Sequence, residues 1–326
     1  MDIALNFFGD HHAPLKAIAK QLGITKAVCT VPFNAKQSTY IESWHTLALR
    51  SQILEMKQYG MEIAVLEGIK FIDAAKLGTK DADQVIDDFC TLLKHMHQLG
   101  IKTVCYNWMP VFGWFRTHLE VPVRGGALAT SFSLDEVKDL EDTSAGKVKA
   151  EDLWKNLAYF LSRVVPVAEM YKIQLALHPD DPPVGKIANV ERILTSSDAM
   201  MKAINLVPSE YNGIAFCQGT FATMGCDVPL EIRRFDKRIH FAHFRDIQGS
   251  AEQFVESFAD DGITDMEATI EAYYDIGFEG VIRPDHSPTF IGESNQNPGY
   301  GILGNLYTIG YLRGLMEAVE KRKRRE

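Results

Sequence analysis

Four side chains of metal-ligating type stand at similar positions in widely separated parts of this sequence. His178 ends the apolar run in QLALHPDDPP, Cys217 ends the run in IAFCQG, His243 lies in IHFAHFR and Asp285 closes VIRPD. Two imidazoles, a thiolate and a carboxylate suit a transition ion such as Mn²⁺, Fe²⁺, Co²⁺ or Zn²⁺ and disfavour Ca²⁺ and Mg²⁺, which prefer oxygen ligands. Because each residue alone is more often a packing residue, their meaning depends on whether the fold brings them together.

The elements that must position these residues are short apolar or β-branched runs separated by segments with helical periodicity. The apolar runs are 3–9, 26–32, 62–68, 103–108, 174–179, 214–219, 239–245 and 281–285, and the clearest helical segments are 43–60, 81–100, 151–171 and 265–278. Such alternation predicts parallel strands with right-handed crossovers, and eight repeats predict a closed (β/α)₈ TIM barrel. An open doubly wound sheet is the alternative, but no glycine-rich phosphate loop follows any of the strands.

A barrel would gather the four candidate ligands in one place. Active sites of this fold lie at the carboxyl ends of the strands, and consecutive strand ends lie side by side. The four residues belong to the fifth, sixth, seventh and eighth expected strands, so they could converge on one ion. His240 lies three residues before His243 and on the opposite face, which predicts a packing role. His11 and His12 follow the first strand and are candidate substrate contacts.

Composition limits the class of protein. A chain of 326 residues that is 46% hydrophobic can form one barrel domain over residues 1–326. A net charge of −9 argues against a nucleic-acid partner, because such proteins need a basic face. The five cysteines form no closely spaced framework, and no segment resembles a leader peptide or a membrane span. These features predict a cytoplasmic protein that binds no membrane.

The segment at about 109–150 is too long and too mixed in composition for an ordinary link between a strand and a helix. Long loops on this face of a barrel usually cover the site, so we expect a lid-like loop insertion there. The aromatic side chains around its start could close over a substrate or pack against a second subunit; they are Trp108, Phe112, Trp114 and Phe115. The sequence therefore leaves open whether the protein forms a homo-oligomer.

Several stretches in order along the chain resemble one enzyme family. KTVCYNWMPVFGWFRT, ALHPDDPP, RIHFAHFR, RPDH and NPGYG are similar to the signature segments of mannonate dehydratase, a member of the xylose-isomerase-like TIM-barrel superfamily. The resemblance implies dehydration of D-mannonate to 2-keto-3-deoxy-D-gluconate in hexuronate degradation, with Mn²⁺ or Fe²⁺. Carried over position by position, it implies the same four metal ligands and an acid/base pair formed by His286 and Tyr300.

The implied chemistry explains the residue types. Removing water from a sugar acid requires a base that takes the C2 proton and an acid that protonates the departing C3 hydroxyl. A divalent ion would stabilise the charge that develops beside the carboxylate. Which of His286 and Tyr300 is the acid stays open. Candidates to contact the substrate or to orient the ligands are Arg116, Arg245, Arg283 and Asn107.

Four alternatives remain at this stage. A related metal-dependent sugar isomerase or epimerase would need no acid aimed at a leaving hydroxyl, so Tyr300 is the discriminating residue. A divergent family member could act on another sugar acid, since the family's histidine pair after the second strand is missing and Ser287 follows RPDH. A catalytically silent barrel that binds a sugar acid or a protein is a third. A phosphodiester-cleaving barrel is disfavoured by the acidic charge.

Overall fold

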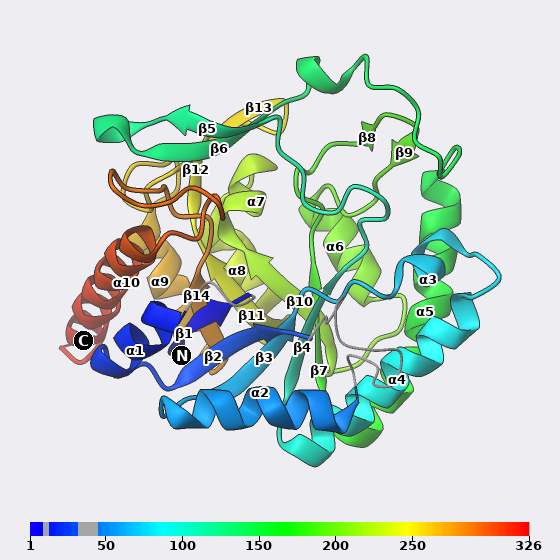
Figure 1. Ribbon diagram of the computed structural model, residues 1–326, viewed down its shortest axis with the longest axis horizontal. Helices are drawn as coiled ribbons and strands as arrows, with labels where there is room; N and C mark the ends of the chain where they lie inside the picture. The colour runs from blue at the N-terminus through cyan, green and yellow to red at the C-terminus, as the bar shows by residue number, and fades with distance from the viewer. Residues whose placement is uncertain (9–12, 32–44, 326) are drawn as a thin grey trace.

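The eight expected strands form a closed parallel barrel. The computed structural model describes residues 1–8, 13–31 and 45–325, so the predicted contacts of His11 and His12 lie outside the described residues. Around the barrel the strand order is β1-β14-β11-β10-β7-β4-β3-β2, the order of the chain itself (Figure 1). The strands are β1 (Asp2–Phe7), β2 (Lys26–Thr30), β3 (Glu62–Glu67), β4 (Thr103–Asn107), β7 (Gln174–His178), β10 (Asn212–Cys217), β11 (Ile239–Phe244) and β14 (Val281–Pro284). The predicted (β/α)₈ TIM barrel is confirmed.

Each strand gives one side chain to an apolar ring inside the barrel. The members of this inner ring are Ala4, Val28, Val65, Cys105, Ala176, Ala215, Phe241 and Val281. Their sequence neighbours, such as Leu5 and Leu66, belong instead to the larger core between the strands and the helices. Because successive side chains on a strand alternate between its two faces, the barrel interior and the outer core are built from the same eight segments.

The same alternation places a second ring nearer the carboxyl ends of the strands. Moving two residues along each strand from the inner ring gives Asn6, Thr30, Glu67, Asn107, His178, Cys217, His243 and Arg283. We call these residues the polar ring, since all of them carry hydrogen-bonding or ligating groups. Three of the four predicted metal ligands belong to it. Because side chains on a strand alternate with a period of two, the polar ring lies directly above the packed apolar inner ring.

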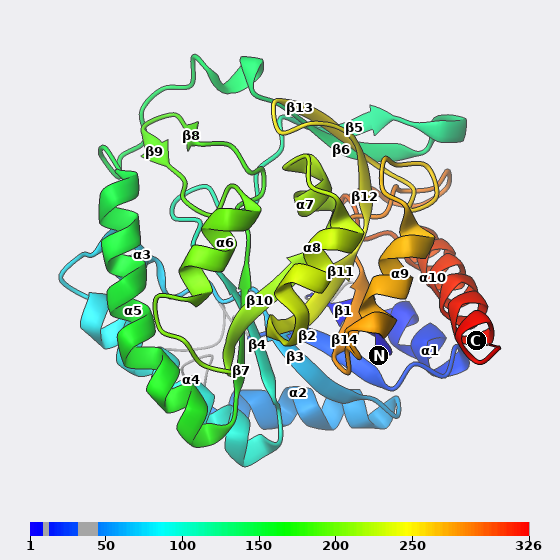
Figure 2. The same cartoon turned by 180° about the vertical axis from the view of Figure 1, so that it is seen from behind.

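Helices surround the barrel on all sides (Figures 1 and 2). The longer ones are α1 (Ala13–Gln21), α2 (Thr46–Gln58), α4 (Ala82–Leu99), α5 (Ala150–Tyr171), α6 (Ser197–Ile204), α8 (Val228–Phe235), α9 (Met266–Asp275) and α10 (Ile302–Lys323), with short α3 (Asp73–Leu77) and α7 (Gln218–Thr223). Helix α4 shows why they form: Ile86, Phe89, Leu93 and Met96 make one buried stripe, and Gly100 ends the helix at a φ of 78°. Among the described residues, none of the helices combines the length and apolar character needed to cross a membrane.

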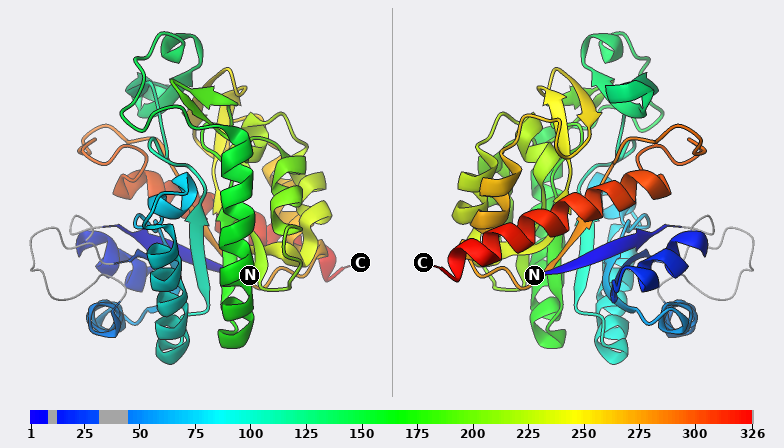
Figure 3. Two further views of the ribbon diagram at one scale, coloured as in Figure 1. Left: turned by 90° about the vertical axis from the view of Figure 1, so that its right-hand side faces the viewer. Right: turned by 90° about the vertical axis from the view of Figure 1, so that its left-hand side faces the viewer.

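An antiparallel sheet lies over one end of the barrel, away from both termini (Figures 1 and 3). Its strands are β5 (His118–Pro122), β6 (Leu128–Ser133), β12 (Asp246–Gly249) and β13 (Gln253–Ser257), in the order β12-β13-β6-β5. We call this the cap sheet. The segment predicted as a lid-like loop at about 109–150 supplies β5 and β6, together with two 3₁₀ turns, η2 (Arg124–Gly126) and η3 (Asp135–Val137). The other half comes from the link between β11 and α9, which the sequence analysis did not anticipate. A further small pair is β8 (Lys186–Ile187) with β9 (Val190–Glu191).

Candidate active site

Three of the predicted metal ligands meet at the carboxyl ends of adjacent strands. His178, Cys217 and His243 each offer one ligand atom, and these atoms all lie within 4.8 Å of one another. They come from β7, β10 and β11, which are neighbours in the barrel. The two imidazole rings are 5.0 Å apart between centroids. Because the three side chains converge from three strands, they support binding of one metal ion better than any of them does alone.

The fourth predicted ligand, Asp285, borders this cluster from the end of β14. Its Oδ2 lies 3.9 Å from Cys217 Sγ and 3.6 Å from His243 Nδ1. His243 is buried, and within the described chain neither of its ring nitrogens makes a hydrogen bond, although Glu67 Oε1 lies 3.2 Å from Nε2. Buried polar groups are normally paired, so an unpaired imidazole beside a thiol and a carboxylate fits a bound transition ion.

A second candidate cluster, formed by Glu67, Cys105 and His243, fits a metal less well. Cys105 belongs to the inner ring, and burial, reinforced by the negative charge of Glu67, raises the pKa of its thiol well above the usual range. A thiol that stays protonated is a poor ligand. Glu67 is better placed as an outer partner of His243, a common arrangement around histidine ligands.

Beneath the cap sheet, two arginines share two carboxylates in a fully buried network. Arg116 donates to both Asp181 oxygens, at 2.6 and 3.0 Å, and its Nε donates to Glu256 at 3.2 Å. Arg245 donates to Asp181 at 2.8 Å and to Glu256 at 3.2 Å. Burial alone would raise the pKa of both carboxyl groups, but the arginines outweigh it and lower both values. Asp181 and Glu256 therefore remain ionised, and the four charges compensate one another.

Arg245 also reaches the ligand cluster. Its Nε donates to Cys217 Sγ at 3.3 Å and lies 3.0 Å from Asp285 Oδ2, while the Thr220 hydroxyl donates to the same sulfur at 3.1 Å. On the other side, Arg283 donates to Asp285 Oδ1 at 2.8 Å and to both oxygens of Glu67. The two arginines thus hold the predicted thiolate and carboxylate ligands in place.

The expected substrate contacts therefore have partners within the chain. Arg116, Arg245 and Arg283 are engaged in the ion pairs just described. Asn107 accepts hydrogen bonds at Oδ1 from Lys76 Nζ and from the backbone N–H of Met109, each at 3.1 Å. The three arginines thus face carboxylates of this chain.

His286 and Tyr300 come together on the cap side of Asp285. The Tyr300 hydroxyl donates to Asp285 Oδ1 at 3.1 Å, and the rings of His286 and Tyr300 are 5.3 Å apart. His286 Nδ1 lies 3.0 Å from Glu256 Oε1, and its Nε2 lies 3.6 Å from Asp285 Oδ1. Burial, with the adjacent Asp285 charge, raises the pKa of Tyr300 well above its usual value. The Trp114 ring, 5.1 Å from His286, adds an aromatic wall from the predicted lid segment.

Backbone geometry explains the residues around this pair. His286 has a φ of 39°, a left-handed conformation that residues other than glycine rarely adopt and that often marks functional positions. Gly299 also has a positive φ of 85°, and a Cβ there would lie 2.9 Å from His286 Cα. Only glycine lets the two segments approach this closely. The glycine of NPGYG is thus the residue that lets Tyr300 sit beside His286.

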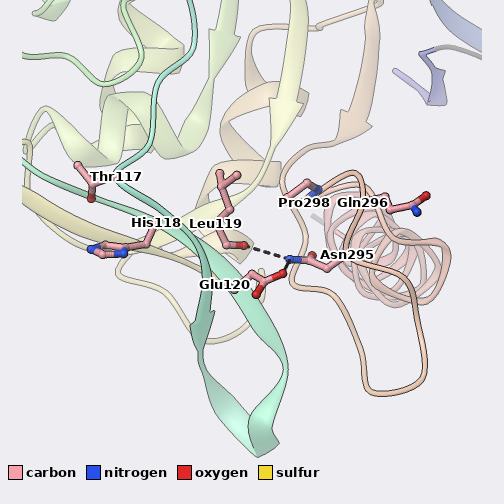
Figure 4. Close-up of a pocket in the computed structure, with 7 residues that line it drawn as sticks. All are labelled: Thr117, His118, Leu119, Glu120, Asn295, Gln296 and Pro298. Carbon is pink, nitrogen blue, oxygen red and sulfur yellow. Dashed lines mark hydrogen bonds between the residues drawn. The ribbon is translucent and has the colours of Figure 1, made fainter.

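The loop that carries Tyr300 is fastened to the cap sheet. Thr289 and Leu128 exchange backbone hydrogen bonds of 2.9 and 2.7 Å. Asn295 Nδ2 donates to the carbonyl oxygen of Leu119 at 3.2 Å and lies 3.4 Å from Glu120 Oε1 (Figure 4). Figure 4 shows the surface hollow between the two segments, which is lined by Thr117, His118, Leu119, Glu120, Asn295, Gln296 and Pro298. None of the predicted site residues lines this hollow, so it is a seam between the cap sheet and the loop.

Sequence reasoning missed the carboxylates that organise the site. Glu67 and Glu256 lie on strands, and Asp181 lies in HPDDPP without an assigned role. The available signal was the set of arginines at strand ends, because buried guanidinium groups require carboxylate partners. His240 lies near the opposite ends of the strands, with its ring nitrogens 2.8 Å from the carbonyl oxygen of Leu175 and 3.0 Å from that of Glu210.

The closed parallel barrel with its surrounding helices has the fold of the xylose-isomerase-like TIM-barrel proteins. Solved structures with this fold include an L-ribulose 3-epimerase, with a TM-score of 0.64 and 12% identity over 99% of this chain and 97% of that one. At this identity the similarity concerns the fold alone.

More specific comparisons establish the family. The sequence profile of the D-mannonate dehydratase (UxuA) family matches residues 1–147 and 143–326. Mannonate dehydratase of Oceanobacillus iheyensis is 32% identical over 98% of both chains, and mannonate dehydratase 2 of Halalkalibacterium halodurans is 33% identical over 98% of this chain and 99% of that one. The crystal structure of mannonate dehydratase from Streptococcus suis serotype 2 superposes with a TM-score of 0.91 and 30% identity, over 99% of this chain and 94% of that one. The chain belongs to the D-mannonate dehydratase family, which confirms both the resemblance and the expected hydro-lyase class.

The ion pair between Glu67 and Arg283 predicts a specific dependence of stability on pH. Burial opposes ionisation of Glu67, but Arg283 and His243 lower its pKa from 4.5 to about 2. Its ionised form thus stabilises the folded state above pH 4.5, and this contribution is lost as the pH falls from 4.5 towards 2. We expect Glu67→Gln to reduce the free energy of unfolding at pH 7 by on the order of 3 kcal/mol, with the difference from wild type shrinking on acidification.

Urea unfolding of metal-free protein between pH 7 and pH 3 measures this difference. Glu62→Gln is the matched control, because Glu62 lies on the same strand with an exposed side chain paired to Lys26. Exposed pairs contribute under about 1 kcal/mol, so the control should follow wild type throughout. A Glu67→Gln deficit that stays constant with pH would contradict the ion-pair assignment.

Proposed function

We propose that this chain dehydrates D-mannonate to 2-keto-3-deoxy-D-gluconate with the help of a divalent transition ion, Mn²⁺ or Fe²⁺. Family membership supports the substrate class. The observation that carries the proposal is the position of Asp285, which borders the His178, Cys217 and His243 cluster on one side and accepts the Tyr300 hydrogen bond on the other. Metal ligation and acid/base chemistry therefore meet at one carboxylate. With all five cysteines free, a cytoplasmic location also remains our proposal.

The residues that would hold the ion are His178, Cys217, His243 and Asp285. When bound, such an ion acts as a Lewis acid that stabilises negative charge developing on the substrate's carboxylate and C2 hydroxyl. Arg245 and Thr220 both donate to the Cys217 sulfur, which fixes its position at the end of β10. Glu67 Oε1 lies 3.2 Å from Nε2 of His243, and this electrostatic contact would help to orient the ring.

The hydrogen bonds around His286 and Tyr300 suggest how they divide the proton transfers. Glu256 accepts from Nδ1 of His286, which leaves a lone pair on Nε2 facing the site, so we assign His286 as the base. Tyr300 is a hydroxyl donor beside Asp285 and is assigned as the acid. His286 takes the C2 proton, the C–H electrons form the C2–C3 double bond, and the C3 hydroxyl leaves as water with the proton of Tyr300. The resulting enol tautomerises to the 2-keto acid.

The three arginines are assigned a positioning role. Arg245 and Arg283 hold Cys217 and Asp285, and Arg116 acts through Glu256, so none of them is assigned to the substrate carboxylate. Asn107 stays a candidate substrate contact through Nδ2, because Lys76 and Met109 hold its Oδ1. An isomerase or epimerase would share the metal and the base, but the presence of Tyr300 beside Asp285 favours elimination of a hydroxyl.

The direct test is turnover of D-mannonate by metal-stripped protein reconstituted with Mn²⁺ or Fe²⁺, with formation of the 2-keto acid as the readout. Cys217→Ala should weaken metal binding by about 10- to 100-fold and reduce turnover with it, whereas Tyr300→Phe should keep the metal and lose about 100-fold or more in kcat. Cys226→Ala, at a half-buried cysteine outside the site, is the control and should change neither. Tight metal binding without keto-acid formation would refute D-mannonate as the substrate and direct the test to other sugar acids.

A second test concerns the contact between Glu256 and His286. Glu256→Gln removes the carboxylate that orients His286, so kcat should fall about 10- to 100-fold with little change in KM. Asp181→Asn is the matched control, because Asp181 pairs with the same two arginines and makes no hydrogen bond to His286 among the described residues. Both variants should lose similar thermal stability. Equal losses of kcat would mean that Glu256 acts only through the arginines.

A third test uses two glycines of the same loop. Gly299→Ala places a methyl group 2.9 Å from His286 Cα, whereas Gly292, with a similar φ of 87°, has nothing within 4 Å of the added carbon. Both substitutions should cost about 1 kcal/mol through the left-handed backbone. Only Gly299→Ala should also reduce kcat by 10-fold or more, because it displaces His286 from Tyr300. Similar kcat values for the two variants would show that the spacing of the pair is not critical.

A further inference from the structure

One polar side chain inside the barrel has no hydrogen-bond partner among the described residues and no assigned role. Asn6, on β1, is fully buried, and neither its Nδ2 nor its Oδ1 makes a hydrogen bond within the described chain. Burying an amide without partners costs about 1–3 kcal/mol. A folded protein rarely keeps such a group in its interior unless something else satisfies it.

The other ligating and charged members of the polar ring have partners or belong to the metal cluster. Glu67 pairs with Arg283, Asn107 accepts from Lys76, and His178 Nδ1 lies 2.7 Å from the Pro179 carbonyl oxygen. His243 and Cys217 form the cluster described above. Within the part of the chain that the structure describes, Asn6 is thus a buried group of this ring that neither the packing nor the candidate metal site explains.

The position of Asn6 relates it to the reacting groups. Ala4 belongs to the inner ring and Phe8 packs against that ring, so strand alternation points Asn6 between them into the barrel. In the parallel ladder between β1 and β14, Ile3 pairs with Ile282; extending this register sets Asn6 level with Asp285. The Phe8 ring contacts that of Tyr300 at 5.7 Å between centroids. Asn6 therefore lies two residues before Phe8 on the same face of β1, and Phe8 contacts Tyr300, the proposed acid.

We propose that the Asn6 amide binds a hydroxyl group of the sugar-acid chain and thereby helps to select which polyhydroxy acid is accepted. The inference rests on the proposed function, which supplies a polyhydroxylated ligand. An amide offers a donor and an acceptor side by side, and a hydroxyl group can satisfy both. A carboxylate would leave Oδ1 unpaired, and a cation would leave Nδ2 unpaired. A pocket with a fixed amide discriminates against analogues that lack or misplace the hydroxyl, because the buried amide is then left unpaired.

The test depends on opposite effects of one substitution. Asn6→Leu replaces the amide by an apolar group of similar size, so we expect the melting temperature of the substrate-free protein to stay equal or rise. The same variant should raise KM for D-mannonate about 10-fold, which corresponds to one lost hydrogen bond. Its preference between D-mannonate and sugar acids that differ at one hydroxyl should weaken by a similar factor. Asn6→Ala, which is smaller, should also raise KM and shows that the effect is not a steric clash of leucine.

Asn212→Leu is the matched control. Asn212 is equally buried at the start of β10, far from the polar ring, and its Nδ2 donates to the carbonyl oxygens of Ile204 and Val207. Its replacement should lower the melting temperature and leave KM and substrate preference unchanged. If Asn6→Leu and Asn6→Ala behave like this control, the proposal is wrong and Asn6 has a purely structural role.

A separate readout distinguishes failure of this inference from failure of the proposed function. If wild-type protein does not turn over D-mannonate, the shift of its melting temperature is measured with a panel of hexonic and pentonic acids. A sugar acid that stabilises wild type but stabilises both Asn6 variants at least several-fold less supports the contact without mannonate chemistry. Equal stabilisation of wild type and the variants overturns it, whatever the reaction.

Discussion

Compensation of buried charge is the constraint on which the rest of this structure depends. Arg245 is fully buried, and its guanidinium group faces the sulfur of Cys217 and the carboxylates of Asp181, Glu256 and Asp285. A guanidinium group carries five donors in a rigid plane, so it can join several acceptors in a way that an ammonium group cannot. Removing one member of such a network leaves the others charged and unpaired, which costs several kcal/mol. The ligands are thus held by the same forces that keep the barrel mouth folded.

This network also joins two parts of the chain with different roles. The barrel strands supply the cluster of candidate metal ligands, since His178 and Cys217 end β7 and β10, and His243 lies one residue before the end of the neighbouring β11. The cap sheet supplies Glu256, which lies on β13 and accepts from His286. Because Arg245 donates to Glu256 and to Cys217, and Glu256 contacts His286, a displacement of the cap sheet would disturb His286 and Cys217 together. The cap sheet is therefore part of the site as well as a cover over it.

The sequence was sufficient to predict the strands of the barrel but not those of the cap sheet, and the difference has a physical reason. Barrel strands are buried on both faces and read as apolar runs, and the position of chemistry at their ends follows from the fold. Strand β5 is largely exposed along its length, so it leaves no such pattern. Glu67 and Glu256 were missed because a carboxylate on a strand normally indicates a solvent-facing position. The arginines at the strand ends indicate that buried carboxylates exist, but only the three-dimensional arrangement shows which ones they pair with, such as Glu67 with Arg283.

The two rings inside the barrel show how stability and chemistry are separated in space. The inner ring is apolar and close-packed, so it stabilises the barrel without bearing on specificity. The polar ring, two residues further along each strand, holds buried groups that make no hydrogen bond among the described residues, including the Asn6 amide and both ring nitrogens of His243. Buried polar groups without partners are expected where a protein binds a ligand, because the ligand can supply the missing partners. Since each strand contributes to both rings, the apolar layer beneath the polar ring provides packing that offsets the cost of the unpaired groups in that ring.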